Sequence, residues 1–306
     1  MTIDSLISPA SDPANWHPEV AAAHRTASIR IRQAMRRHHE MFELMNAWRK
    51  LDPVTWHPTI ADDAMSWDLR IEVQQAPPLE EASILFAEAI HHLRTALNIA
   101  LQEVARRGRF PIKPAALQYP LALTSKEFKS HERRLLGLPK YLKDAILWRQ
   151  PFQLNAANPA AHTLAILASL DNEAKHRTNL AGVAAVENID SMLVPVLEAG
   201  ASLPTPRRIS YEVNASENWL FAREDTSPHH INDLSGSVDI VVDLSFTDSS
   251  GNAHPATSFL QAAFEETSTS IGYLLAPWND RMSNPESQFR VKPGASFVRP
   301  QPQEGD

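Results

Sequence analysis

The sequence predicts a mainly α protein of the α+β class, in which a HEPN-like helical bundle carries a small antiparallel β portion. Two long segments, residues 19–51 and 79–107, lack proline and glycine and repeat apolar residues at helical spacing. Residues 209–246 instead hold short runs of β-branched and aromatic residues, divided by Asn, Ser, Asp and Gly. We therefore expect the long helices to form the bundle and the later runs to form the sheet.

The bundle is predicted over residues 19–184, after a flexible lead-in at residues 1–18. Asp52-Pro53 ends the first long helix because proline cannot continue it. Alternating apolar and polar residues then predict an inserted β-hairpin at about residues 56–75. Gly108 ends the second long helix.

Shorter helices are expected to complete the bundle. Thr124-Ser-Lys-Glu127 has the spacing of a capping box, which predicts the start of a helix. The expected helices span about residues 125–135, 139–149 and 159–183, the last opened by a first-turn proline. The remaining chain is divided into a β-rich portion with a C-terminal helix over residues 185–277, and a flexible tail over residues 278–306.

The composition excludes several classes of protein. The chain has no cysteine, so disulfides, thiol chemistry and iron–sulfur clusters are excluded. It shows no run long and apolar enough for a membrane span and no secretory signal, which predicts a cytoplasmic protein without a membrane partner. Residues 1–150 carry 20 basic and 17 acidic residues, whereas residues 151–306 carry 9 and 19. The basic first half could therefore approach phosphate groups.

Two predicted helices each present a polar stripe that contains histidine. The stripe on the second long helix covers about 120° of its surface and consists of Glu88, His91, Arg94, Thr95, Asn98 and Gln102. On the later helix, one arc holds Asp171, Asn172, Lys175, His176 and Asn179. If the two faces meet, His176 could act as a general acid or base while Arg94 and Lys175 bind an anion. The alternative is two independent solvated faces.

A metal site is a further alternative. Glu88-x-x-His91 and Glu173-x-x-His176 both have the spacing that di-iron carboxylate bundles use twice. Such a site needs two more carboxylates, for which Glu40 or Glu43 and Glu127 or Glu132 are available. No glycine-rich phosphate loop or Gly-x-Ser-x-Gly motif is present, which argues against nucleotide-binding folds and α/β-hydrolases. We expect no cofactor.

Three segments resemble a widespread group of uncharacterised bacterial proteins. They are His91-His-Leu-Arg-Thr-Ala-Leu-Asn98, Phe110-Pro-Ile112 and Asn172-Glu-Ala-Lys-His-Arg177, in the order that the group shows. The group's Arg-plus-His helix is similar to the HEPN signature. The resemblance implies a helical, homodimeric, metal-independent ribonuclease or RNA-binding protein of toxin or defence type.

The resemblance also assigns roles to individual residues. The expected catalytic residues are Arg94, His176 and His91, and the expected substrate-binding residues are Lys175, Asn98, Asn172, Glu88 and Arg177. The sequence departs from the group at Ile99, which stands where the group has a histidine. Because isoleucine cannot transfer a proton, this departure favours a second hypothesis, a non-enzymatic oligomeric binding module.

Overall fold

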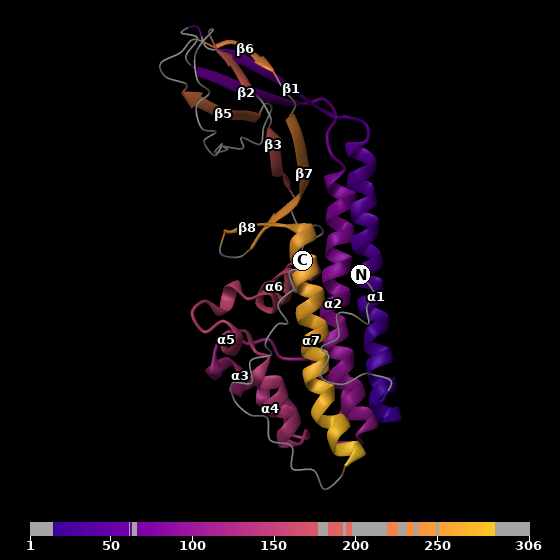
Figure 1. Cartoon of the computed structure of the whole chain (residues 1–306). Helices are drawn as coiled ribbons and strands as arrows, with labels where there is room; N and C mark the ends of the chain where they lie inside the picture. Colours follow the sequence, from indigo (N-terminus) through magenta and orange to yellow (C-terminus); the bar gives the residue numbers. More distant parts are fainter. Residues whose placement is uncertain are drawn as a thin grey trace, which may run out of the picture. The chain divides into compact units, whose positions relative to one another are not determined.

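A computed structural model of the chain describes residues 15–60, 62, 66–176, 183–191, 194–197, 219–225, 231–235, 238–248 and 251–284. These residues form a mainly α structure with a smaller antiparallel β part, which confirms the predicted fold class (Figure 1). The strand predicted at residues 209–213 and most of the predicted lead-in and tail lie outside the described residues.

The described α-helices are α1 (Pro18–Arg49), α2 (Leu79–Arg107), α3 (Ser125–Glu132), α4 (Lys140–Trp148), α5 (Pro151–Leu154), α6 (Thr163–His176) and α7 (Ala256–Ser283). The predicted start of α3 is confirmed with Thr124 as its N-cap, although the Glu127 carboxylate bonds to the residue before the cap. The Thr124 hydroxyl accepts a hydrogen bond from the Glu127 backbone N–H at 3.1 Å, and the Glu127 carboxylate accepts one from the Leu123 N–H at 2.8 Å. Two backbone donors at the helix end are thereby satisfied.

Helix α6 is shorter than predicted at both ends. Pro159–Ala161 forms a separate 3-10 turn, and the α-helix begins at Thr163. The Nδ1 atom of His162 accepts a hydrogen bond from the Leu164 backbone N–H at 3.2 Å, so His162 caps the helix. At the other end, Val183 already belongs to a β-strand.

Helix α7 is longer than predicted, because Pro277 lies inside it. Residues 278–283 therefore belong to the helix and not to the expected tail. Trp278 is fully buried, and the Asn279 side-chain oxygen accepts a hydrogen bond from the His17 backbone N–H at 2.7 Å. Burial of a tryptophan stabilises by about 2–3 kcal/mol, which offsets the hydrogen bond that proline cannot donate.

The strands form antiparallel sheets. The first sheet has the strand order β1 (Val54–Ile60), β2 (Ser66–Val73), β5 (Trp219–Asp225). The second has the order β3 (Val183–Ser191), β7 (Val238–Thr247), β8 (Ala253–Pro255). In the third, β4 (Val194–Leu197) pairs with β6 (Ile231–Ser235). Val54 lies opposite Val73, which confirms the predicted hairpin. Its second strand also pairs with β5, so a later strand joins the hairpin.

The chain divides into two compact units. Unit one contains residues 1–31, 93–165 and 264–306, and unit two contains residues 32–92 and 166–263. Each unit is built from segments far apart in sequence, whereas the sequence had suggested consecutive blocks. The difference arises because long helices pair with partners from distant parts of the chain.

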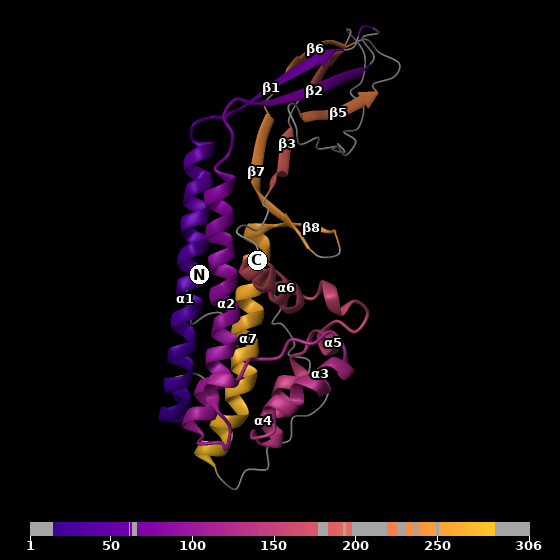
Figure 2. The same cartoon turned by 180° about the vertical axis from the view of Figure 1, so that it is seen from behind.

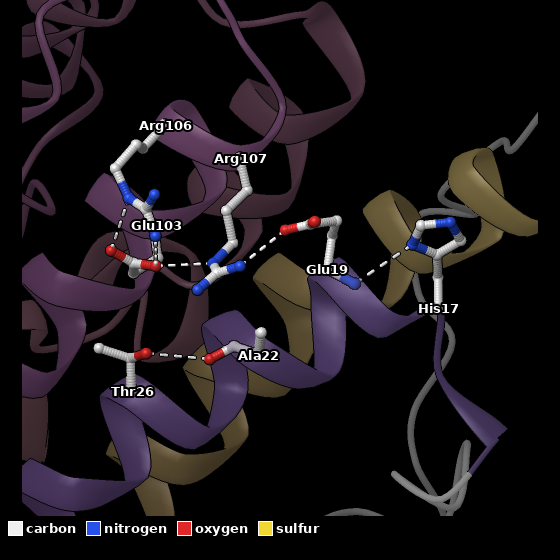
Figure 3. Close-up of polar contacts among 7 residues, drawn as sticks. All are labelled: His17, Glu19, Ala22, Thr26, Glu103, Arg106 and Arg107. Atoms are coloured by element: carbon white, nitrogen blue, oxygen red, sulfur yellow. Dashed lines mark hydrogen bonds and ion pairs between the residues drawn. The ribbon is translucent and has the colours of Figure 1, made fainter.

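In unit one, the start of α1 lies beside the end of α2 (Figures 1 and 2). A chain of ion pairs joins the two ends, as Figure 3 shows. Arg107 donates to Glu19 and to Glu103, each at 2.7 Å, and Arg106 donates to Glu103 at 2.6 Å. Both helix ends therefore carry charges that interact favourably with the helix dipole. Glu19 lies at the N-terminus of α1, and the arginines lie at the C-terminus of α2.

The core of unit two contains an aromatic cluster. The rings of Phe86 from α2 and Phe246 from β7 have centroids 5.0 Å apart, and Phe259 from α7 lies 5.0 Å from Phe246. All three side chains are buried. The cluster thus joins two helices to the second sheet.

Candidate functional site

The polar stripe of α2 divides into groups with different partners. In unit one, Arg94 Nη2 donates to the Tyr119 carbonyl oxygen at 2.7 Å, and the Asn98 side-chain oxygen accepts from the Tyr119 N–H at 2.9 Å. Gln102 Nε2 donates to the Leu117 carbonyl oxygen at 2.9 Å. These side chains therefore bind the backbone of the connector that follows α2, which is a structural task.

In unit two, Glu88 accepts from Arg37 Nε at 2.7 Å, and Arg37 Nη1 also donates to Glu40 at 2.6 Å. The hydrogen bond from Arg37 lowers the pKa of the Glu40 carboxyl, and the hydrogen bond from Arg36 lowers it further. Glu88 thus connects α2 to the basic run of α1, which we define as residues 32–39 with their arginines and histidines.

His91 makes the contact that brings the two predicted polar faces together. Its Nδ1 lies 3.0 Å from Oδ1 of Asp171, which is on α6. Lys175 Nζ donates to the other carboxylate oxygen, Oδ2. His91, Asp171 and Lys175, which we call the His91 cluster, all belong to unit two.

Burial differs sharply within the His91 cluster. The side chain of Asp171 is only 2% exposed, whereas those of His91 and Lys175 are 52% and 48% exposed. An ionised carboxylate can only accept, so Nδ1 of His91 carries the proton in this hydrogen bond. The neutral imidazole consequently keeps Nε2 as a proton acceptor. A buried carboxylate that orients an accessible imidazole is the arrangement used for general acid–base catalysis.

The sequence of α6 explains why Asp171 is buried. Leu164, Leu167 and Leu170 are all buried, and Asp171 lies one turn after Leu167 on the edge of that apolar face. Lys175 follows four residues later, so it stands one turn further along the same side of the helix. The hydrogen bonds from His91 and Lys175 offset the free-energy cost of burying the Asp171 carboxylate next to the leucines.

The structure describes the remaining expected site residues of α6 only in part. Asn172 is exposed and Glu173 is half-buried. The backbone of His176 ends α6, but its side chain and the whole of Arg177 lie outside the described residues. The sequence placed Asp171 on the polar arc without giving it a role. The sequence feature that could have identified Asp171 as a site residue is a carboxylate at the edge of an apolar helix face with a lysine four residues later.

The metal alternative finds no support in the described part of the chain, where no three His, Asp or Glu side chains gather as a metal site would require. Of the residues proposed for it, Glu88 pairs with Arg37 and His91 with Asp171.

Unit two contains a second Asp–His pair, at the turn between β7 and β8. His254 Nε2 lies 2.8 Å from Oδ2 of Asp248, and Oδ1 of the same carboxylate accepts from the Asn252 N–H at 2.9 Å. The His254 ring stacks on Phe246. This pair closes a β-turn, so it provides a natural control for the His91 cluster.

No protein-family model matches the chain, and neither the curated proteins nor the solved structures contain a significantly similar one. Among the described helices, each is either too short or too polar to cross a lipid bilayer.

Proposed function

We propose that the chain is a cytoplasmic, metal-independent RNA-cleaving protein of the toxin or defence type, with the His91 cluster as its catalytic centre. The observation that carries the proposal is the buried Asp171 carboxylate, which holds an accessible imidazole and an accessible ammonium group at once. An acid–base group and a cation side by side are what phosphodiester cleavage without a metal needs.

The reaction is a transesterification. His91 Nε2 accepts the proton of the ribose 2′-hydroxyl while O2′ forms a bond to phosphorus. The P–O5′ bond breaks, and the imidazolium returns the proton to the departing 5′-oxygen. The products are a 2′,3′-cyclic phosphate and a 5′-hydroxyl. Lys175 stabilises the negative charge that develops on the phosphate oxygens, and Asp171 stabilises the imidazolium.

The basic run of α1 supports RNA as the substrate. Arg32, Arg36 and His39 are exposed in unit two. The Arg37–Glu88 ion pair connects this part of α1 to α2 one turn before His91. Cationic side chains near the His91 cluster would bind the phosphates of an RNA strand in a way that weakens with added salt.

The test is incubation of the purified chain with total RNA in the presence of EDTA. We expect cleavage that leaves cyclic phosphate ends, and a loss of at least about 100-fold in rate for His91→Ala and for Asp171→Asn. The matched control is His254→Ala, which removes the other Asp-paired histidine and should leave the rate unchanged. Circular dichroism and thermal unfolding of each variant separate lost chemistry from lost folding. Absence of cleavage, or an undiminished rate in folded His91→Ala, would refute the catalytic proposal.

The second candidate function is an oligomeric RNA-binding module without catalysis. Arg94 and Asn98, which the family resemblance implies as site residues, both bind the backbone of Tyr119. Together with Ile99 this favours binding without turnover. RNA affinity that falls steeply with salt, no cleavage, and a dimer mass by light scattering would select this function. A monomer without RNA affinity would reject it.

A further inference from the structure

Unit one carries a surface of positive charge on α3 and on the 3-10 turn (Arg133–Leu135) that follows it. Its cations, which we call the α3 stripe, are all exposed: Lys126, Lys129, Arg133 and Arg134. The backbone stays helical from α3 through the turn, because Glu132, Arg133 and Leu136 all have α-helical φ and ψ. At roughly 100° per residue, Lys126, Lys129 and Arg133 therefore lie within about 60° of one another on one face.

The opposite face of this segment packs against the rest of unit one. Phe128 and Leu135 are buried, and the Phe128 ring lies 6.4 Å from the ring of Phe152 on α5. A Cβ on Gly137 would lie 2.7 Å from the Pro111 carbonyl oxygen, so the connector packs directly against this glycine. The α3 stripe is thus presented on a packed scaffold. Only its side chains need to become ordered when a partner binds, which keeps the entropic cost of binding low.

The carboxylates of the same segment are already engaged. Glu127 lies 3.8 Å from His131 and accepts from a backbone N–H, while Glu132 lies 3.8 Å from Lys143. By contrast, no cation of the α3 stripe pairs with a carboxylate anywhere in the part of the chain that the structure describes. Residues 123–144 hold 6 basic and 3 acidic residues, whereas the whole chain has a net charge of −7. The stripe is therefore a local excess of positive charge that suits a partner with repeated negative charges.

The composition of the segment separates the classes of partner. Lysine and serine are depleted in protein–protein interfaces, but arginine, lysine and serine make many of the contacts to phosphate groups in nucleic acids. Ser125 and Ser130 are exposed beside the stripe. Leu136 is 73% exposed, but Phe128 is buried, so the segment offers a lipid bilayer a single leucine. One leucine is smaller than one acyl chain, which by itself binds membranes only marginally.

We propose that the α3 stripe binds the phosphate backbone of single-stranded RNA. From Lys126 to Arg133 the helix rises about 10 Å, so the stripe can contact several phosphates of one strand. Contacts to phosphates carry no sequence information, so this binding should not depend on the bases. The choice of RNA as the polyanion rests on the proposed function, whereas the excess charge of the stripe does not.

The first test is titration of the full chain in EDTA with a fluorescent 2′-O-methyl oligouridine, which cannot be cleaved because its 2′-oxygen is blocked. The stripe variant combines Lys129→Gln with Arg133→Gln. The matched control combines Lys140→Gln with Lys143→Gln, which removes two cations of the same segment that already pair with Asp144 and Glu132. Circular dichroism of each variant verifies that it is folded.

We expect the unmodified chain to bind the oligonucleotide and the stripe variant to bind at least about fivefold more weakly at low salt. The slope of log affinity against log salt should also become shallower by about 1.4, since each phosphate contact on a single strand contributes about 0.7. The control should change both quantities much less. No binding by the unmodified chain, or equal losses in the two folded variants, would overturn the proposal.

The second test separates RNA from the other anionic partners. Polyglutamate, added at the same concentration of charge, should displace the oligonucleotide poorly, and the chain should not sediment with phosphatidylserine vesicles. Leu136→Ser should keep the affinity for the oligonucleotide, because phosphate contacts do not use an apolar side chain. Efficient displacement by polyglutamate would point to an acidic protein, and sedimentation with vesicles would point to a membrane surface. Either result, or loss of affinity in Leu136→Ser, would overturn the proposal.

Failure of this site and failure of the proposed cleavage can be told apart. His91→Ala should bind the oligonucleotide as tightly as the unmodified chain, because His91 is not part of the α3 stripe. If no RNA is cleaved but the stripe variant loses affinity, the binding site stands without the reaction. If RNA is cleaved but the stripe variant binds normally, the reaction stands and the α3 stripe is not its RNA contact.

Discussion

The backbone N–H of Tyr119 donates a hydrogen bond to the side-chain oxygen of Asn98 at 2.9 Å. Tyr119 is fully buried, so Asn98→Ala would leave this N–H without a partner. We expect the free energy of unfolding to fall by about 1–3 kcal/mol, measured by urea denaturation. Asn172→Ala, which removes an exposed amide on α6, should change it little. Equal stability of the two variants would show that the connector is held by other contacts.

The hydroxyl group of Tyr119 is buried and makes no well-formed hydrogen bond to any described residue, although Ser270 lies near it. Burial raises the pKa of Tyr119 because the phenolate would be desolvated. Tyr119→Phe removes an unsatisfied polar group, so we expect it to raise the free energy of unfolding by about 1 kcal/mol. Denaturant titration checks this, with the half-buried Tyr141→Phe as the comparison. A loss of stability would reveal a hidden partner, such as a bound water molecule.

Arg107 and Arg106 are neighbours with different partners. Arg107 is 21% exposed and bridges Glu19 and Glu103, whereas Arg106 is 55% exposed and pairs with Glu103 (Figure 3). We expect Arg107→Ala to lower the free energy of unfolding by about 1 kcal/mol, because it removes the ion pair between α1 and α2, and Arg106→Ala to have a smaller effect. Thermal unfolding at low and high salt compares them. The reverse order would contradict the bridging role.

Acid should destabilise unit one through His162. Burial lowers its pKa in the folded state below the ordinary 6.5, so between these two values the unfolded chain binds more protons. The free energy of unfolding should therefore fall as the pH drops below about 6.5. His162→Asn should flatten this dependence, as measured by urea titrations at pH 7.5, 6.5 and 5.5. Parallel profiles for the two proteins would show that His162 does not contribute.

Two glycines should respond oppositely to alanine. A Cβ at Gly272, inside α7, would meet no atom within 4 Å, whereas Gly251 has a φ of +85°. Gly272→Ala should raise the free energy of unfolding by about 0.5–1 kcal/mol because alanine favours the helix. Gly251→Ala should lower it by about 1 kcal/mol because φ is unsuited to a side chain. Calorimetry of both variants tests the pair, and stabilisation by Gly251→Ala would be inconsistent with the turn.

Local signals predicted much of the fold. The absence of proline and glycine located α1 and α2, and the Thr124–Glu127 spacing located the start of α3. Pro277 misled the prediction because its effect depends on how well the neighbouring Trp278 is buried, which is a tertiary property. The end of the helix expected at residue 183 was wrong for a similar reason, since Val183 pairs with β7.

The candidate site was only partly predictable. Periodicity put His91 and Lys175 on polar faces, but it could not show that both would contact one carboxylate. Periodicity also grouped Arg94 and Asn98 with His91, although their partners are backbone atoms of the connector. Helical periodicity shows which side chains point in similar directions. The contacts that each of them makes depend on which other segment of the chain packs against that turn of the helix.

Hydrogen-bonding side chains on α2 and their partners on the connector are spaced at nearly equal distances along the two segments. Four residues of helix advance about 6 Å, and two residues of extended chain advance about 6.6 Å. Asn98 and Gln102 are four residues apart on α2, while their partners Tyr119 and Leu117 are two residues apart and run in the opposite direction. If one residue were inserted between Leu117 and Tyr119, the hydrogen bonds of Asn98 and Gln102 to the connector could not both form. The connector should therefore tolerate changes of side chain far better than changes of length.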